Sequence, residues 1–255
     1  MLAAKNILIN SSKRTGVPLF ILILFIVILQ SCLISRKLPE GTANAEADAL
    51  ARKVMKITGQ EHWEDTRIVE WSFKGKRYHL WDRERNLHIQ EWKNFKVVQD
   101  LNNKKGMVFK GEEQLHGEDA DKYLEKAWRN WINDSFWLNP FWKMFDEGTT
   151  RLLVDWKGKT ALMISYSSGG LTPGDSFLWI LDEDAMPVKW KLWVSVIPLK
   201  GYGLSWEDWQ EMSTGVKYST KHRGFAQQVK ILSVKGVKDL RNIYPKEDPF
   251  RILFK

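Results

Sequence analysis

The sequence predicts an α+β fold in which one large antiparallel sheet collects its helices on one face. Three observations predict this fold: a helical pattern in residues 46–59, a long series of short alternating segments from Thr66 onward, and a second helical pattern in residues 118–134. The alternating segments correspond to about ten or eleven strands. A sheet of that many strands does not stay flat, so we expect it to curl strongly or partly close.

Two segments follow the periodicity of an amphipathic helix. In residues 46–59, EADALARKVMKITG, the apolar residues Leu50, Val54 and Ile57 recur at helical spacing, and the final glycine is a natural C-terminal cap. In residues 118–134, EDADKYLEKAWRNWIND, apolar and aromatic residues recur at the same spacing behind an acidic first turn. We therefore expect one leading helix and one helical insertion between two groups of strands.

The other segments alternate between apolar and polar residues with a period of two, which is typical of half-buried strands. Residues 66–73 and 76–81 are joined by the short connection Lys74-Gly75-Lys76, which predicts a hairpin. The remaining predicted strands lie within residues 86–92, 95–101, 106–111, 150–156, 159–168, 175–184, 187–197 and 203–237. No linker and no fixed repeat interrupts them, so the sequence predicts a single domain over residues 46–255.

The N-terminus predicts export and lipidation. Residues 1–31 contain three basic and no acidic residues, and the apolar run Val17–Leu29 follows the basic part, as in a secretory signal. The tetrapeptide LQSC, ending at Cys32, resembles the lipobox of bacterial lipoproteins. In that family the cysteine carries a diacylglycerol, cleavage occurs just before it, and its new amino group is usually acylated. We therefore predict a lipoprotein signal peptide at residues 1–31, lipidation of Cys32, and attachment to a membrane.

Two alternatives remain for this segment: an uncleaved transmembrane anchor, and a chance buried cysteine. The apolar run Val17–Leu29 has 13 residues, whereas a spanning helix needs about 20. Cys32 is the only cysteine, so an exported domain would have to be held by its core rather than by disulfides. Residues 32–45 contain Pro39 and Gly41 and no apolar period, and we expect them to form a lipidated tether.

Charge and motifs exclude several classes of function. The net charge of +8 falls to +5 without the three basic residues of the signal, a mild excess that does not predict a nucleic-acid partner. This excess fits either a weak attraction to anionic headgroups or an ordinary solvated surface. The glycine-rich segment 167–175 lacks the lysine of a phosphate loop, and no Gly-x-Ser-x-Gly motif is present. Acidic residues are plentiful, yet nothing singles out a glycosidase pair.

His79 and His88 could face each other across a hairpin, but two histidines make an incomplete zinc site. We expect them to be exposed strand residues. The sequence thus predicts a protein that is not an enzyme and that has neither a metal nor a cofactor.

The stretch WINDSFWLNPFWKMFD, residues 131–146, is unusually aromatic. One helical stripe takes up only part of it, because Phe136, Trp137 and Phe141 lie off the stripe and Pro140 interrupts the helix. The rings could all pack into a thick core. Alternatively, the segment could form a lid over an apolar cavity that stays partly open. The candidate ligand-binding rings are those of Trp128, Trp131, Phe136, Trp137, Phe141 and Trp142.

A resemblance to a known family supports the second alternative. The pattern consists of Asp134-x-Phe136-Trp137-x-x-Pro140, then Asp146-x-Gly148, and later Pro173-Gly174-Asp175. It resembles an uncharacterised family of secreted or lipid-anchored bacterial proteins in the LolA-like superfamily of lipoprotein carriers and receptors, over about residues 46–240. The resemblance implies a half-open β-barrel, with helices covering its concave face and acyl chains entering the hollow. An anchored chain is closer to the receptor, which implies an outer-membrane location facing the periplasm.

Carbohydrate binding is the alternative function, because exposed tryptophans stack on sugar faces. A sugar platform needs coplanar rings that face solvent and are surrounded by polar groups. In LWILDEDAMPVKWKLWVSVI, residues 178–197, tryptophans are interleaved with aliphatic residues instead. This favours rings turned inward, toward a lipid or an acyl chain.

The lipobox leads to a direct prediction. Cys32→Ser removes the thiol that would accept the diacylglycerol, so this variant should accumulate as an unprocessed precursor without labelled fatty acid. Metabolic labelling followed by gel electrophoresis measures both effects. Normal processing and labelling of the variant would show that Cys32 is not the lipidation site.

Overall fold

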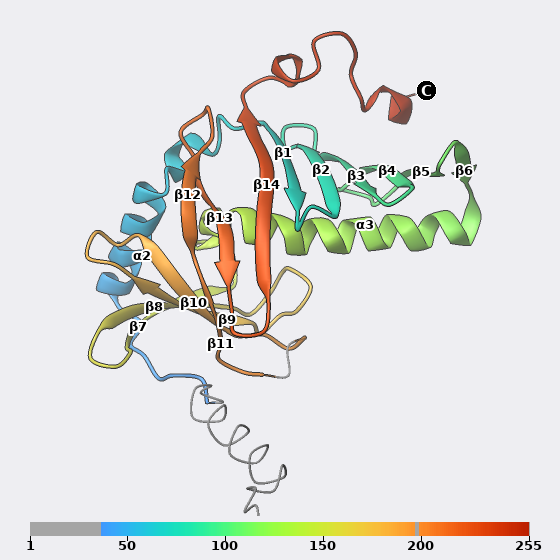
Figure 1. Cartoon of the computed structure of the whole chain (residues 1–255). Helices are drawn as coiled ribbons and strands as arrows, with labels where there is room; N and C mark the ends of the chain where they lie inside the picture. The colour runs from blue at the N-terminus through green and yellow to red at the C-terminus, as the bar shows by residue number, and fades with distance from the viewer. Residues whose placement is uncertain (1–36, 197–198, 255) are drawn as a thin grey trace, which may run out of the picture.

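The computed structural model describes residues 37–196 and 199–254, and it has an α+β fold (Figure 1). The predicted signal peptide and Cys32 lie outside the described residues. The described part contains fourteen strands in two antiparallel sheets and two α-helices. The prediction of a single sheet of about ten or eleven strands was therefore wrong in both the number of strands and the number of sheets. The two sheets do not form a closed barrel.

The larger sheet joins the first and last parts of the domain. Its nine strands follow the order β12-β13-β14-β1-β2-β3-β4-β5-β6. Their bounds are β1 Ile68–Phe73, β2 Arg77–Asp82, β3 Leu87–Trp92, β4 Phe95–Asp100, β5 Gly106–Lys110, β6 Glu113–Leu115, β12 Glu207–Glu211, β13 Lys217–Arg223 and β14 Gln228–Val237. Strands β1–β5 form the expected meander, and β6, which the sequence did not predict, extends it. Pairing of β14 with β1 then adds the C-terminal hairpin to its edge.

The second sheet has five strands, in the order β11-β10-β9-β8-β7. Their bounds are β7 Thr149–Asp155, β8 Thr160–Tyr166, β9 Ser176–Leu181, β10 Pro187–Trp193 and β11 Tyr202–Ser205. A helix separates β6 from β7, so β7 begins a new sheet instead of continuing the meander. The chain returns to the first sheet at Trp206, a single residue between β11 and β12. One extended segment thus contributes to both sheets, as strands at the corners of packed sheets do.

Helix α2, Ala45–Ile57, packs against the five-stranded sheet. Asn44 caps it, because its side-chain oxygen accepts a hydrogen bond of 2.9 Å from the backbone N–H of Ala47. Contacts with the sheet begin earlier than residue 46. Thr42 and Leu153 exchange two backbone hydrogen bonds of 2.9 Å each. The structured domain therefore includes residues that we expected in the tether.

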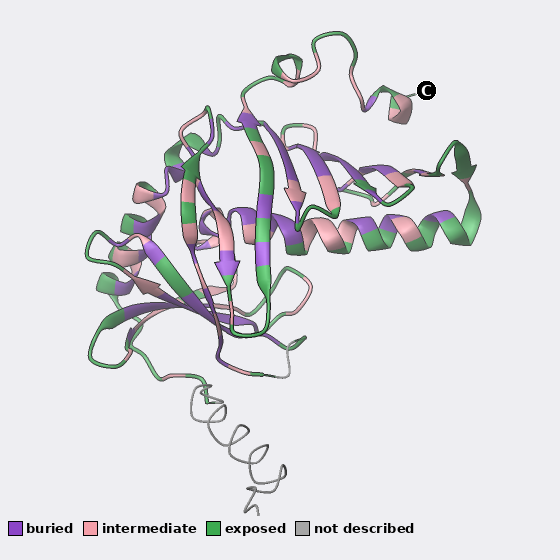
Figure 2. Cartoon of the chain, viewed as in Figure 1, coloured by how far each residue is buried: buried purple, intermediate pink, exposed green. Residues whose placement is uncertain are grey.

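Helix α3, Gly117–Leu138, extends four residues past the predicted end and stops before Pro140. It runs along one face of the nine-stranded sheet (Figure 1). The opposite face carries Leu80 and Ile89, which pack with Phe250 of the C-terminal segment. Both faces of the central strands are consequently buried, as the purple stretches of β1–β4 show (Figure 2). None of the helices in the described ranges combines the length and apolar character needed to cross a bilayer.

The C-terminal end of α3 enters the space between the two sheets. Trp137 packs against the apolar clusters of both sheets, and Phe141 of the following short 3-10 helix η2, Phe141–Lys143, is fully buried against the five-stranded sheet. Phe141 contacts the rings of Trp179 and Trp206, with centroids 5.2 and 5.3 Å away. The aromatic stretch of the sequence therefore joins the two sheets.

Candidate functional site

A pocket of about 370 Å³ lies beside the aromatic stretch. Its walls come from the second half of α3, the segment 142–147, the β8–β9 loop and strands β9 and β10. The volume is near the lower end of the range of about 300–1,000 Å³ that is typical of small-molecule sites. The pocket is the candidate site because its lining combines aromatic rings with a few polar groups at its edge.

The aromatic wall is built from both layers of the fold. Phe136 projects from α3 onto the five-stranded sheet, where its ring lies 4.9 Å from Phe177 and 5.8 Å from Tyr166. Trp137 meets Trp190 edge to face, with centroids 4.9 Å apart and an interplanar angle of 78°. Edge-to-face packing holds such rings in fixed orientations. The pocket therefore has a preformed apolar wall rather than a set of parallel exposed rings.

The structure brings together four of the six candidate rings. Trp131, Phe136, Trp137 and Trp142 line the pocket, and each is partly exposed. Phe141 is 0% exposed and does not line the pocket, because it faces the core. Trp128 also lies outside the pocket lining. The two alternatives for the stretch thus apply to different residues of it.

The polar edge of the pocket carries both positively and negatively charged side chains. Arg129 lines the pocket from α3, and its side chain is exposed. Arg129 forms no ion pair with an acidic side chain of the described residues. Lys143 is paired with Asp146 at 2.6 Å. Asp175 accepts hydrogen bonds from the backbone N–H of Ser195, at 3.0 Å, and from the hydroxyl of Thr172. Lys143, Asp146 and Asp175 are thus bonded within the protein, whereas the Arg129 guanidinium has no such partner among the described residues.

The β8–β9 loop is held against the turn that follows the aromatic stretch. Ser167 N–H donates to the carbonyl of Gly148 at 2.8 Å, and the hydroxyl of Ser168 donates to the carbonyl of Glu147 at 3.2 Å. Gly148 has φ of +79°, and a Cβ there would lie 2.1 Å from Ser168 Oγ. Only glycine fits this close approach. The contact brings the motif around Gly148 beside the loop that contains Pro173-Gly174-Asp175.

A buried polar network lies under α3, close to the pocket. Asp134, whose side chain is 0% exposed, accepts two hydrogen bonds from Arg77, of 2.6 and 2.7 Å, and one of 3.0 Å from His79 Nε2. His79 Nδ1 lies 3.0 Å from Nε2 of His88, and Nδ1 of His88 lies 3.1 Å from the Gln99 amide. The prediction of exposed histidines was wrong, since both rings are 0% exposed. The prediction that they face each other is confirmed.

The orientation of the Gln99 amide sets the direction of hydrogen bonding in the network. Ionised Asp134 can only accept, so His79 Nε2 donates to it and His79 Nδ1 accepts from Nε2–H of His88. Nδ1 of His88 then accepts from the amide of Gln99. The opposite amide orientation satisfies Gln99 itself better, because its oxygen then accepts from His88 Nδ1 at 3.1 Å and from Trp128 N–H at 3.2 Å, and its nitrogen donates to the Leu124 carbonyl at 3.1 Å. In that orientation His79 donates from both ring nitrogens. Burial of the two rings favours the arrangement in which both histidines are neutral.

Burial sets the pKa values of this network. It lowers the pKa of His79, although the hydrogen bond to Asp134 acts in the opposite direction. Burial and then the neighbouring His79 bring the pKa of His88 well below its usual value. Burial tends to raise the pKa of Asp134, but its hydrogen bonds from His79 and Arg77 outweigh burial and leave this pKa lowered. The ion pair with Arg77 thus persists while the histidines stay uncharged.

The arrangement holds α3 against the sheet and does not have the geometry of a metal site. His79, His88 and Asp134 follow one another in a line of hydrogen bonds, instead of surrounding one point. Among the described residues, no group of three or more His, Cys, Asp or Glu side chains could hold a metal ion. Sequence reasoning missed Arg77 and the role of Asp134, because their pairing joins positions 57 residues apart. The signal available was the alternation that places Arg77 and His79 on one face of β2.

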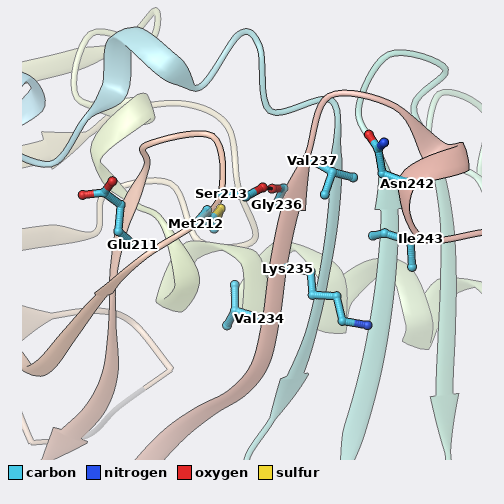
Figure 3. Close-up of a pocket in the computed structure, with 9 residues that line it drawn as sticks. All are labelled: Glu211, Met212, Ser213, Val234, Lys235, Gly236, Val237, Asn242 and Ile243. Carbon is cyan, nitrogen blue, oxygen red and sulfur yellow. Dashed lines mark hydrogen bonds between the residues drawn. The ribbon is translucent and has the colours of Figure 1, made fainter.

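A second cavity of about 370 Å³ lies between the β12–β13 turn and β14 (Figure 3). Figure 3 shows Met212 and Ser213 beside Gly236, and Asn242 on the other side of β14. The hydroxyl of Ser213 donates to the carbonyl of Gly236 at 2.7 Å, and Lys235, which also lines this cavity, pairs with Glu70 at 3.2 Å. These polar groups are bonded within the protein, so we assign no ligand to this cavity.

Comparisons with known proteins assign no family. No protein-family model matches the chain, and no curated protein matches it. Among solved structures, the chain is similar to the crystal structure of a DUF1329 family protein from Desulfovibrio piger, with 8% sequence identity and a TM-score of 0.37. The alignment covers 79% of this chain and 96% of that chain. A similarity at this sequence identity and TM-score supports no conclusion about function, so the site is interpreted from its own residues.

The lowered histidine pKa values predict loss of stability in acid. A histidine whose pKa is lower in the folded state binds its proton only on unfolding, so its contribution is complete above about pH 6.5 and is lost as the pH falls toward the folded pKa. Each such histidine should cost up to about 1.4 kcal/mol per pH unit. Besides His79 and His88, this applies to His222, because burial lowers its pKa to about 4. Thermal unfolding from pH 7.5 to pH 5 measures the loss.

Replacement of one histidine provides the control. His88→Gln cannot titrate in this range, so its melting temperature should fall less steeply between pH 7.5 and pH 5 than that of the wild type. His116→Gln removes an exposed histidine and should leave the slope unchanged. Equal slopes in all three proteins would show that the buried pair does not determine the sensitivity to acid.

Proposed function

We propose that the protein is a lipid-anchored component of the bacterial cell envelope that binds the acyl chain of a lipid or lipoprotein in the pocket beside α3. The observation that carries the proposal is the preformed aromatic wall of the pocket, made by Phe136, Trp137, Phe177 and Trp190. Burial of apolar ligand surface against such a wall is favourable in proportion to the area removed from water. The proposed role is non-catalytic.

The size and shape of the pocket favour a single chain. A volume of about 370 Å³ is small for a whole diacyl lipid but suits one acyl chain. The charged edge around Arg129 offers a place for a polar or anionic head outside the apolar wall. The membrane attachment proposed at Cys32 would keep the pocket close to a source of such ligands. An outer-membrane location facing the periplasm and a half-open barrel architecture belong to the same proposal, and both rest on the resemblance to LolA-like proteins.

Carbohydrate binding remains the alternative, because Arg129, Ser168 and Thr172 provide polar groups beside tryptophan rings. The rings argue against it. Trp137 and Trp190 are nearly perpendicular, whereas a sugar platform uses coplanar rings. We therefore favour the acyl chain.

Two aromatic substitutions separate binding from folding. Phe136→Ala removes a half-buried ring of the pocket wall, so binding should weaken by about 1.5–3 kcal/mol, roughly ten- to a hundredfold, with little change in melting temperature. Phe141→Ala removes a fully buried ring and should cost about 3–5 kcal/mol of stability. Binding is measured in membranes by titrating a photoactivatable fatty acid and quantifying its covalent capture by the full chain.

Three outcomes would contradict the acyl-chain proposal. The first is no saturable capture by the wild type. The second is equal capture by the wild type and Phe136→Ala. The third is saturable binding of a glycan at the same wall, which would support the carbohydrate alternative. Mapping the captured peptide provides a further check, because the modified residues should lie in the pocket lining and not in the cavity beside β14.

A further inference from the structure

Three large apolar side chains protrude from one end of the domain. Val196 is 70% exposed, Phe225 is 62% exposed and Leu199 is 42% exposed. They lie in the described residues 194–196 and 199–201 between β10 and β11 and in the β13–β14 turn, residues 224–227, which together we call the apolar loops. Isolated exposed apolar residues are ordinary on protein surfaces, whereas a group of them marks an interaction site. The contacts around Tyr202 show how the two loops lie relative to each other.

Tyr202 joins the two apolar loops. Its ring lies 5.5 Å from that of Phe225, and its hydroxyl accepts a hydrogen bond of 3.4 Å from the backbone N–H of Ala226. A Cβ on Gly224 would lie 2.1 Å from the same hydroxyl, so the turn fits closely against this ring. On the other loop, Gly201 N–H donates to the carbonyl of Leu192 at 2.7 Å. Through Tyr202, the β13–β14 turn packs next to the strand that begins three residues after Leu199, so the apolar loops lie at the same end of the domain (Figure 1).

The chain enters the domain at the same end. In Figure 1 the blue segment 37–44 starts at the bottom of the view, where the β10–β11 connection and the β13–β14 turn also lie. Cys32 lies five positions before Lys37 in the chain, and Leu29 lies eight positions before it. An extended chain covers at most about 3.6 Å per residue, so these segments reach at most about 18 Å and 29 Å. A membrane attachment at Cys32 or at the apolar run would thus hold this end of the domain at the bilayer.

Charge at this end fits an anionic bilayer. Lys200, next to Leu199, donates to the carbonyl of Val194 at 2.6 Å, and it forms no ion pair with an acidic side chain of the described residues. Its charge is therefore available to lipid headgroups. A basic residue near an anionic membrane surface contributes about 1 kcal/mol of attraction. The same connection also lines the pocket, through Val194 and Val196.

We propose that the apolar loops, with Val196, Leu199 and Phe225, insert into the surface of an anionic phospholipid bilayer, so that the pocket opens next to the membrane. The bilayer contact stands independently of the proposed ligand. The consequence for entry rests on the proposed function: an acyl chain passes from the bilayer along Val196 into the pocket without crossing water.

Depth measurements on the full chain test the contact. An environment-sensitive fluorescent amino acid replaces Phe225 or, as a matched control, Phe254, which is 66% exposed and lies next to the C-terminus at the other end of the molecule (Figure 1). The proteins are reconstituted into vesicles of phosphatidylethanolamine and phosphatidylglycerol, with or without nitroxide-labelled lipid. A side chain inserted about 5–10 Å should be quenched roughly threefold more by the nitroxide at position 225 than at position 254. Flotation of the vesicles verifies attachment.

Three other results would contradict the proposed contact between the apolar loops and the bilayer. These results are equal quenching at the two positions, access of aqueous iodide to position 225 as free as to position 254, and a chain that does not float with the vesicles. Replacement of phosphatidylglycerol by phosphatidylcholine should reduce the difference, because the attraction of Lys200 is then lost. An unchanged difference would contradict the anionic preference.

A pair of aspartate variants tests the route of entry. Phe225→Asp should slow uptake of the photoactivatable fatty acid from vesicles at least several-fold, while Phe254→Asp should leave the rate unchanged. The fatty acid added from solution should saturate both variants at the wild-type concentration. If neither the wild type nor the variants capture the fatty acid, the proposed function is wrong. The depth measurement still tests the contact with the bilayer in that case. Equal uptake rates in the two variants would refute the route.

Discussion

The buried carboxylate of Asp134 is the interaction on which the position of α3 depends. A buried charge is costly unless it is paired and hydrogen-bonded, and Asp134 obtains its partners, Arg77 and His79, from one strand of the nine-stranded sheet. The helix can satisfy the carboxylate at only one position and one rotation on the sheet. Since successive helical residues are rotated by about 100°, Phe136 then points to nearly the opposite side, toward the five-stranded sheet. The pocket wall is thus a consequence of how Asp134 is bonded.

The same geometry explains how a domain of two sheets is held together. Trp137 packs against the apolar clusters of both sheets, and Phe141 completes the core beneath the five-stranded one. The extended segment through Trp206, whose ring contacts Phe141, connects the sheets covalently. The described residues contain no cysteine, so no disulfide links them. Aromatic side chains suit this task, because each buries a large area and orients its neighbours edge to face.

The pocket and the apolar loops are two parts of one arrangement. Val194 and Val196 belong to both, and the aromatic wall continues from them toward α3. Only part of the aromatic stretch is free to contact a ligand, since Phe141 is fully buried in the core. The half-buried rings, such as Phe136, lie at the boundary between core and cavity. Apolar binding sites arise at such boundaries, where the two layers of a fold meet without filling the space between them.

The sequence by itself determined the local structure of this protein. Period-two segments predicted β1–β4 and β7–β10 within a few residues, and the spacing of Leu50, Val54 and Ile57 predicted α2. These patterns depend on which side of each element is buried. The periodic spacing of apolar residues in the sequence shows which side that is. The division into two sheets, the burial of His79 and His88, and the separation of Phe141 from Phe136 were decided by tertiary structure. They depend on contacts between residues such as Arg77 and Asp134, far apart in the chain, and no local periodicity records which residue meets which.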